Sequence, residues 1–105
     1  MSGVFRMPKY RVFFHPRVSS QLESHAEFIA RVSLPAANRM KEEFDAIITR
    51  LGESPYQFPL AQNPNLPADV YRTASFAKWY QLVFSVEGDT VYIDAVVDMR
   101  SNYTL

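Results

Sequence analysis

The sequence predicts an α+β fold with the element order β-α-α-β-β-β, in which a helical hairpin covers one face of a four-stranded sheet. Three successive runs of β-branched and aromatic residues occupy positions 70–98, and a shorter run of the same kind precedes them near the N-terminus. Between these parts, apolar residues recur three or four positions apart, as on one side of an α-helix. The two helices are the elements available to cover the apolar face of the sheet.

The composition indicates a single domain with its own core. The chain has 105 residues, of which 48% are apolar, and we expect the domain to span residues 9–105 after a flexible arm at residues 1–8. The absence of cysteine excludes disulfides, thiolate zinc sites and cysteine nucleophiles. With no signal peptide or membrane span in the sequence, we expect a cytoplasmic protein.

The charge balance bears on the kind of partner. Eleven basic and eleven acidic residues leave no formal net charge. A protein that grips nucleic acid through its phosphates usually carries a basic excess, because neutralisation of phosphate supplies most of the non-specific affinity. The zero net charge therefore argues against a nucleic-acid substrate, although basic residues can still be grouped on one part of the surface.

Residues 10–15 predict the first strand, and Pro16 stands where the first turn of a helix tolerates proline. The first helix should end near Val32, because Pro35 disfavours helical geometry in the residue before it. Its apolar stripe consists of Val18, Leu22, Ala26, Ile29 and Val32.

The second helix begins around the second of these prolines and carries a cleaner stripe. Ion pairs are expected at i,i+4 on its outer side, between Arg39 and Glu43 and between Lys41 and Asp45. Gly52 is placed to terminate the helix. The stripe consists of Ala37, Met40, Phe44, Ile47 and Leu51.

A proline-rich loop at residues 53–69 leads into strands at 70–76, 79–86 and 90–98. In the second of these strands, Tyr80, Leu82, Phe84 and Val86 are expected on one face. In the last strand, the same period of two places Val91, Ile93, Ala95 and Val97 on one face.

Charged residues of the strands offer two candidate sites. Arg72, Lys78 and Arg100 come from neighbouring strands and could converge on an anion, because arginine presents a rigid fork to phosphate. They could equally pair with carboxylates on a solvated face. Asp94 and Asp98 share the polar side of the last strand, where they either do acid–base chemistry or simply face solvent.

The remaining polar and aromatic residues carry weaker signals. The two histidines do not form a cluster with metal-ligand spacing, and no nucleophile elbow is present, so we predict neither a metal site nor a cofactor. Trp79 is the only tryptophan. Aromatic residues on an open sheet face stack bases or anchor a protein partner, but most of those here are expected in the core.

Several segments together resemble the RelE/ParE superfamily of bacterial toxins, whose members include plasmid-stabilisation proteins. The resemblance covers residues 10–103 and is carried by Tyr10-Arg-Val-Phe-Phe-His-Pro16, the "LGESP" from Leu51, Val70-Tyr-Arg72, and the stretch from Tyr80 to Arg100. It implies a helical hairpin on a mainly antiparallel sheet, with a cleft holding the active residues on the opposite sheet face. It also implies a cognate antitoxin, with which the toxin forms a hetero-oligomer, and no membrane partner.

The superfamily implies two alternative mechanisms. RelE-like members cut mRNA on the ribosome without a metal, and by position Arg72, Arg100 and Tyr103 would be the catalytic residues. ParE-like members poison DNA gyrase. Gln81 and Ala74 stand where the RNase pattern has basic residues.

The two aspartates further disfavour the RNase mechanism. By strand parity, Asp94 and Asp98 would face the cleft, where negative charge opposes stabilisation of a transition-state anion. We therefore expect a growth-inhibiting toxin of a type II toxin–antitoxin system that acts on DNA gyrase. The alternatives are a ribosome-dependent mRNA endonuclease and a non-toxic scaffold that binds a peptide along a strand edge. The residues expected to bind the target are Arg72, Lys78, Trp79, Gln81 and Arg100.

Overall fold

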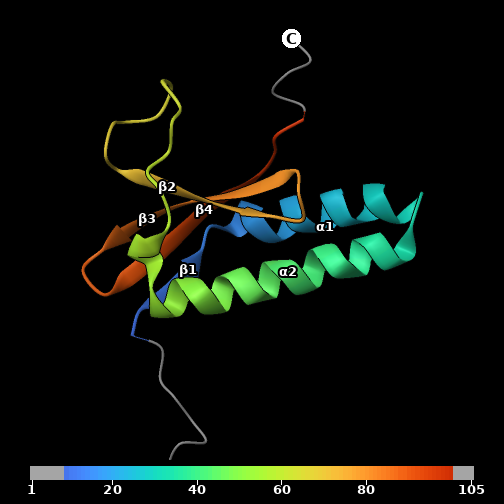
Figure 1. The fold of residues 1–105 in the computed structure, drawn as a ribbon, viewed down its shortest axis with the longest axis horizontal. Helices are drawn as coiled ribbons and strands as arrows, with labels where there is room; N and C mark the ends of the chain where they lie inside the picture. Colours follow the sequence, from blue (N-terminus) through green and yellow to red (C-terminus); the bar gives the residue numbers. More distant parts are fainter. Residues whose placement is uncertain (1–8, 101–105) are drawn as a thin grey trace, which may run out of the picture.

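The computed structural model describes residues 9–100, which form a four-stranded sheet with two helices packed against one face (Figure 1). The strand order is β1-β4-β3-β2. The strands are β1 (Arg11–Phe14), β2 (Tyr71–Phe76), β3 (Tyr80–Glu87) and β4 (Thr90–Asp98). β1 runs parallel to β4, whereas β2, β3 and β4 pair antiparallel. The predicted α+β fold with a mainly antiparallel sheet is confirmed.

The predicted arm at residues 1–8 lies outside the described residues, and so does Tyr103. Among residues 9–100, no helix combines the length and the hydropathy needed to cross a membrane.

Both helices begin where the sequence predicts, because a polar side chain caps each one. The helices are α1 (Pro16–Ala30) and α2 (Leu34–Glu53). The His15 imidazole accepts a hydrogen bond from a backbone N–H in the first turn of α1 (3.1 Å), and the Ser33 hydroxyl does the same for α2 (3.2 Å). Each cap satisfies an N–H that the helix itself leaves without a partner.

Both predicted helix ends are wrong by a residue or two. α1 ends at Ala30, so Val32 lies in the connection, where it is 90% exposed rather than part of the apolar stripe. The chain turns there because the Val32 N–H donates back to the Ile29 carbonyl (3.0 Å). Gly52 is buried inside the last turn of α2, and its carbonyl accepts a hydrogen bond from the Tyr10 N–H (3.0 Å).

The charged residues of α2 contact neighbouring elements. Lys41 Nζ forms its ion pair with Glu23 Oε1 on α1 (3.3 Å), and the predicted pair with Asp45 is not formed. Glu43 accepts a hydrogen bond from the Ala77 N–H in the β2–β3 turn (2.8 Å). Pairs at i,i+4 contribute only about 0.2–0.5 kcal/mol, so tertiary partners displace them.

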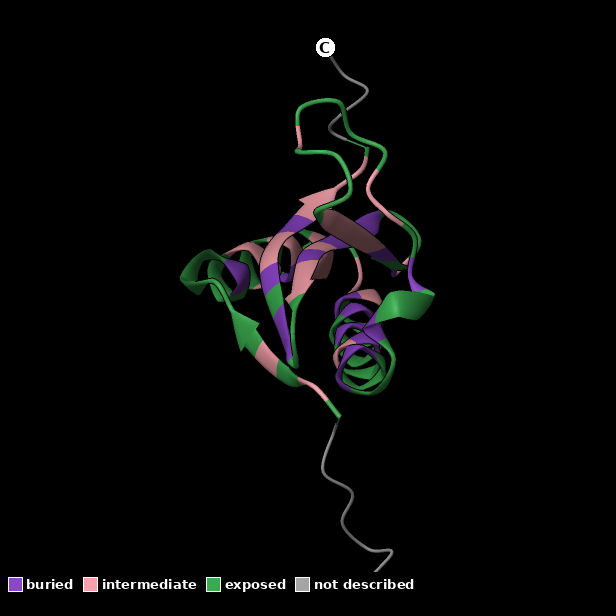
Figure 2. Cartoon of the chain, turned by 90° about the vertical axis from the view of Figure 1, so that its left-hand side faces the viewer, coloured by how far each residue is buried: buried purple, intermediate pink, exposed green. Residues whose placement is uncertain are grey.

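The core lies between the helices and the sheet. Figure 2 shows buried residues alternating with more exposed ones along the central strands. The predicted stripe of α2 is buried throughout, and on β3 Tyr80, Leu82 and Phe84 are each at most 2% exposed. Burial of such side chains contributes about 1.5–3 kcal/mol each, which fixes the face that the sheet turns to the helices.

The predicted faces of β4 are correct only as far as Ile93. Ile93 pairs with Phe84, but Ala95 pairs with the adjacent Val83, so Asp94 is an extra residue on β4. This is a β-bulge, and one inserted residue exchanges the faces of all residues that follow it.

The bulge changes which residues of β4 reach the core. Val96, at 2% exposed, joins the core, whereas Ala95 and Val97, which were predicted to face it, are half-buried on the other side. Asp98 consequently moves to the helix side with Val96. The strand period alone does not reveal a bulge, because no residue type in β4 marks it.

Candidate functional site

The face of the sheet opposite the helices carries a cleft of about 630 Å³, where the resemblance implies the active residues. We call it the open-face cleft. Its wall is the loop at residues 59–66, and its floor is formed by side chains from β2, β3 and the end of β4. These floor residues are Thr73, Gln81, Val83, Val97 and Met99.

Backbone hydrogen bonds hold the wall of the cleft against β2. The Thr73 N–H donates to the Pro59 carbonyl (3.0 Å), and the Ala61 N–H donates to the Tyr71 carbonyl (2.8 Å). Residues 59–61, in the middle of the loop predicted at residues 53–69, thus extend the sheet beyond β2 as a short additional segment. Pro59 and Pro64 restrict the backbone of this loop, because the proline ring fixes φ.

Arg72 holds the same loop from the helix side. Its Nη1 donates to the Phe58 carbonyl (2.6 Å), and its guanidinium lies 5.0 Å from the centre of the Tyr56 ring. A hydrogen bond from a charged donor is worth about 1.5–3 kcal/mol. Arg72 therefore positions the wall of the cleft and does not line the cleft itself.

The chemistry of the open-face cleft is that of neutral amides. Among the described residues that line it, none is ionisable. Its polar groups are the carboxamides of Gln62, Asn63, Asn65 and Gln81 and the hydroxyl of Thr73. Such a surface offers neither a general acid or base nor a cation to hold a phosphate.

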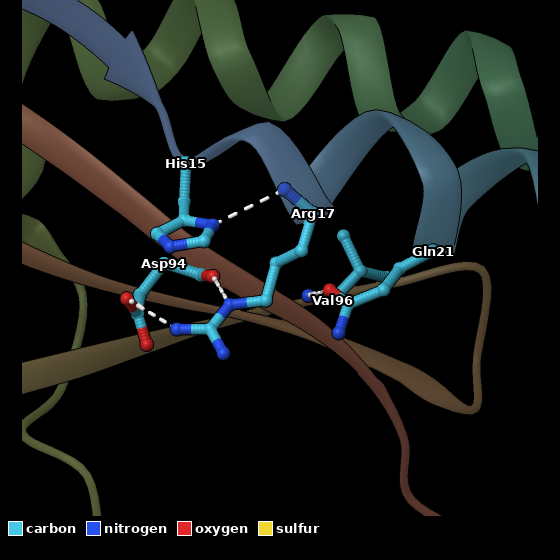
Figure 3. A network of polar contacts seen from close by, with 5 residues as sticks. All are labelled: His15, Arg17, Gln21, Asp94 and Val96. Atoms are coloured by element: carbon cyan, nitrogen blue, oxygen red, sulfur yellow. Dashed lines mark hydrogen bonds and ion pairs between the residues drawn. The ribbon is translucent and has the colours of Figure 1, made fainter.

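The prediction that Asp94 and Asp98 share the cleft is wrong. Figure 3 shows Asp94 held by α1: its carboxylate lies 3.1 Å from Arg17 Nη2, and its carbonyl accepts from Arg17 Nε (2.9 Å). Nearby, the Gln21 side chain accepts from the Val96 N–H (2.8 Å). Arg17 and Gln21 thus hydrogen-bond to backbone groups of β4 that lie beyond the end of β1 and have no strand partner on that side among residues 9–100.

A second hollow, of about 330 Å³, lies on the helix side where α1, α2 and the β2–β3 turn meet. We call it the Trp79 corner. It contains three cationic side chains, one carboxylate and an exposed aromatic ring. Its residues are Ile29, Ala36, Arg39, Met40, Glu43, Ala77, Lys78, Trp79, Tyr80 and Arg100.

The β2–β3 turn at this corner is strained. Ala77 and Lys78 have φ angles of 49° and 71°, a region that favours glycine. The Trp79 N–H donates to the Ala77 carbonyl (2.7 Å), which closes a γ-turn with Lys78 at its centre. Each residue held in such a conformation costs about 1–3 kcal/mol. The bond from the Ala77 N–H to Glu43 on α2 helps to hold the turn.

Cations gather around the Trp79 ring, which is 43% exposed. Lys78 Nζ lies 5.3 Å from the ring centre and the Arg100 guanidinium lies 5.7 Å from it. Arg100 also forms an ion pair with Asp98 (3.1 Å) and donates to the Tyr80 hydroxyl (3.3 Å).

These contacts shift two pKa values. The hydrogen bond from Arg100 lowers the pKa of Asp98 below 3.8, against the opposing effect of burial. Burial, followed by the charge of Asp98, raises the pKa of Tyr80 above 10.0. At neutral pH Tyr80 is therefore neutral, and Asp98 is ionised and paired with the Arg100 of the corner.

The structure divides the predicted site residues into three groups. Lys78, Trp79 and Arg100 come together in the Trp79 corner, while Gln81 lies across the sheet in the open-face cleft. Arg72 pairs with Phe84, four residues along β3 from Tyr80, which is about 13 Å at the usual rise of a strand. The anion site predicted from Arg72, Lys78 and Arg100 is therefore not formed.

Sequence reasoning missed the contribution of α2 to the corner. The i,i+4 spacing predicts an ion pair between Arg39 and Glu43 on the solvated side of the helix, yet both residues line the hollow. The contact joins positions 43 and 77, and no local pattern signals an approach across that separation.

The comparisons with known proteins agree with this architecture. A family model described as "ParE toxin of type II toxin-antitoxin system, parDE" matches residues 4–103. The structure is similar to one from the chromosomal ParDE TA system of P. aeruginosa, with a TM-score of 0.67 and 13% identity over 86% of this chain and 96% of that one. It is also similar to one from the archaeal RelE-RelB complex of Pyrococcus horikoshii OT3, with a TM-score of 0.54 and 16% identity over 87% of this chain and 96% of that one.

No curated protein sequence matches the chain at a significant level. The two structural similarities, at these identities, establish the fold, and the family model extends over nearly all of the sequence. The chain belongs to the ParE toxin family of type II toxin–antitoxin systems.

Proposed function

We propose that this toxin stops growth by binding DNA gyrase in the cytoplasm, and that a cognate antitoxin neutralises it by forming a hetero-oligomer with it. The observation that carries the choice of target is the open-face cleft, whose described lining holds no ionisable side chain. The match to the ParE family model favours the same branch of the superfamily.

Cleavage of mRNA without a metal requires a cation at the scissile phosphate and groups that transfer protons. The cleft offers carboxamides instead, and Gln81 occupies the position at which the resemblance expects an arginine. Arg72 is bound to the Phe58 carbonyl on the other side of the sheet, and Arg100 is bound to Asp98. A protein that acts by binding needs none of these groups in the cleft.

The proposal of an antitoxin partner is supported by the two similar structures. One belongs to a ParDE TA system and the other to a RelE-RelB complex. The first is a toxin–antitoxin system and the second is a complex of two proteins, which supports a partner protein for this toxin.

The test is induced expression in a bacterial host, with thymidine and methionine incorporation followed side by side. We expect thymidine incorporation to fall first, and the purified toxin to inhibit supercoiling by purified gyrase. Co-expression of the antitoxin is the control and should restore both rates. An early fall in methionine incorporation accompanied by cleaved mRNA would contradict the proposal.

A further inference from the structure

We propose that the Trp79 corner is the docking site for an acidic segment of the toxin's target protein, with an apolar side chain of that segment entering the hollow. The inference rests on the proposed function, because it requires a toxin that acts by binding a protein. Three features of the corner carry it: the composition of the hollow, the charge of its rim and the strain in the turn.

The hollow is built as an anchor site. Its walls include the apolar side chains of Ile29, Met40 and Ala77, and Tyr80 forms a buried part of it at 2% exposed. The only tryptophan of the chain stands at its edge, 43% exposed. Tryptophan, tyrosine and arginine are the residues that most often dominate binding energy at protein interfaces, where they lie in well-packed pockets from which the surrounding contacts exclude water.

The rim carries a net positive charge among the described residues, because Arg39 and Lys78 outnumber the single carboxylate of Glu43. Glu43 accepts a hydrogen bond from the Ala77 N–H and keeps its negative charge, whereas the charge of Asp98 is paired with that of Arg100. Among residues 9–100, neither Arg39 nor Lys78 takes part in an ion pair. With Arg100 paired to Asp98, Arg39, Lys78 and Glu43 leave one net positive charge at this corner of a chain with no formal net charge, and an acidic segment is the complementary partner.

The strain in the turn points to a role beyond folding. Lys78 adopts φ +71°, although glycine would adopt that angle with little cost. Strained backbone of this kind concentrates at functional sites, where the surrounding structure holds it in place. Here the γ-turn places the Lys78 and Trp79 side chains together on the rim, with Lys78 Nζ 5.3 Å from the centre of the indole ring.

The test uses Lys78→Glu and Arg39→Glu, which reverse the two available charges on two separate elements. Arg11→Glu is the matched control: it makes the same change at an exposed arginine of β1, which does not line the corner. Inhibition of gyrase supercoiling is measured with the purified toxins, after circular dichroism and thermal unfolding have shown that each variant is folded.

We expect each corner variant to need at least about tenfold more toxin for half-inhibition, which corresponds to about 1.4 kcal/mol. Arg11→Glu should stay within about twofold of the wild type. Equal potency of the wild type and both corner variants would overturn the proposal, while the proposed function would stand. Failure of the wild type itself to inhibit gyrase would instead refute the proposed function.

Two counter-measurements exclude other occupants. Binding of the purified antitoxin should change by less than about threefold in the corner variants. If antitoxin binding is lost while gyrase inhibition is kept, the corner serves the antitoxin and the proposal is wrong. A labelled single-stranded RNA is the second probe, and tight RNA binding that both charge reversals abolish would also refute an acidic protein segment as the occupant.

Discussion

The open-face cleft and the Trp79 corner lie on opposite faces of one sheet, yet they are built from adjacent residues. Tyr80 lines the corner and Gln81 lines the cleft, and Arg100 and Met99 are divided in the same way. The cleft is larger, walled by a loop and, in its described lining, uncharged. The corner is smaller, cationic and aromatic. The alternation of a β-strand therefore separates residues that the sequence presents as one group.

The difference between the two hollows underlies our proposal that the toxin binds its target through the Trp79 corner. The cleft has the position that the resemblance assigns to an active site, but amides occupy it. The corner holds a strained turn, three cations and the exposed indole. A fold does not by itself fix a function, because the side chains that line a site decide its chemistry.

The largest expected effect tests whether Tyr80 and Gln81 lie on opposite faces of the sheet. Tyr80→Ala should lower the free energy of unfolding by about 3–5 kcal/mol, because it removes a buried aromatic ring between the corner and the core. Gln81→Ala, one residue along, should change it by less than about 1 kcal/mol. Urea unfolding of both variants checks this, and equal losses would mean that the two faces are not divided as described.

Arg72→Ala tests whether the cleft wall depends on the arginine behind it. Loss of the bond to the Phe58 carbonyl and of the contact with Tyr56 should lower the free energy of unfolding by about 1.5–3 kcal/mol. Amide hydrogen exchange at residues 59–66 should accelerate more than exchange in α1. Growth inhibition should persist at a temperature at which the variant is folded; its complete loss there would favour a catalytic Arg72.

Lys78→Gly should change stability and toxicity in opposite directions. Glycine adopts φ +71° without the penalty of a side chain, so the variant should be more stable by about 0.5–1 kcal/mol. It should nevertheless inhibit growth less, because the rim loses a cation. A gain in stability with undiminished toxicity would show that Lys78 has no part in binding.

The smallest effect concerns the pH dependence of the ion pair between Asp98 and the Arg100 of the corner. The folded-state pKa of Asp98 lies below 3.8, chiefly because of Arg100, so its ionised form stabilises the fold. That contribution is fully present above about pH 4 and is lost as the pH falls through the lowered pKa. Asp98→Asn should be less stable than the wild type at neutral pH, and the difference should shrink below about pH 4. A difference that stays constant across this range would exclude the ion pair as its source.

The sequence by itself determined the elements of this protein and their order. The stripe of α2 and the helix-facing residues of β3 were predicted from periods of 3.6 and two, because each records a single buried face. The starts of both helices were predicted from proline and the residues around it. The family was recognised from the strand and turn segments, since these keep their order along the chain.

Only the tertiary structure decided which residues share a site. The bulge at Asp94 moved Asp98 to the helix side and left the cleft uncharged, and its cause is strand pairing, not any residue type in β4. The approach of Glu43 to Ala77 built the Trp79 corner from positions far apart in the chain. Local patterns record which face of an element is buried, whereas register and long-range contacts depend on the packing of the whole domain.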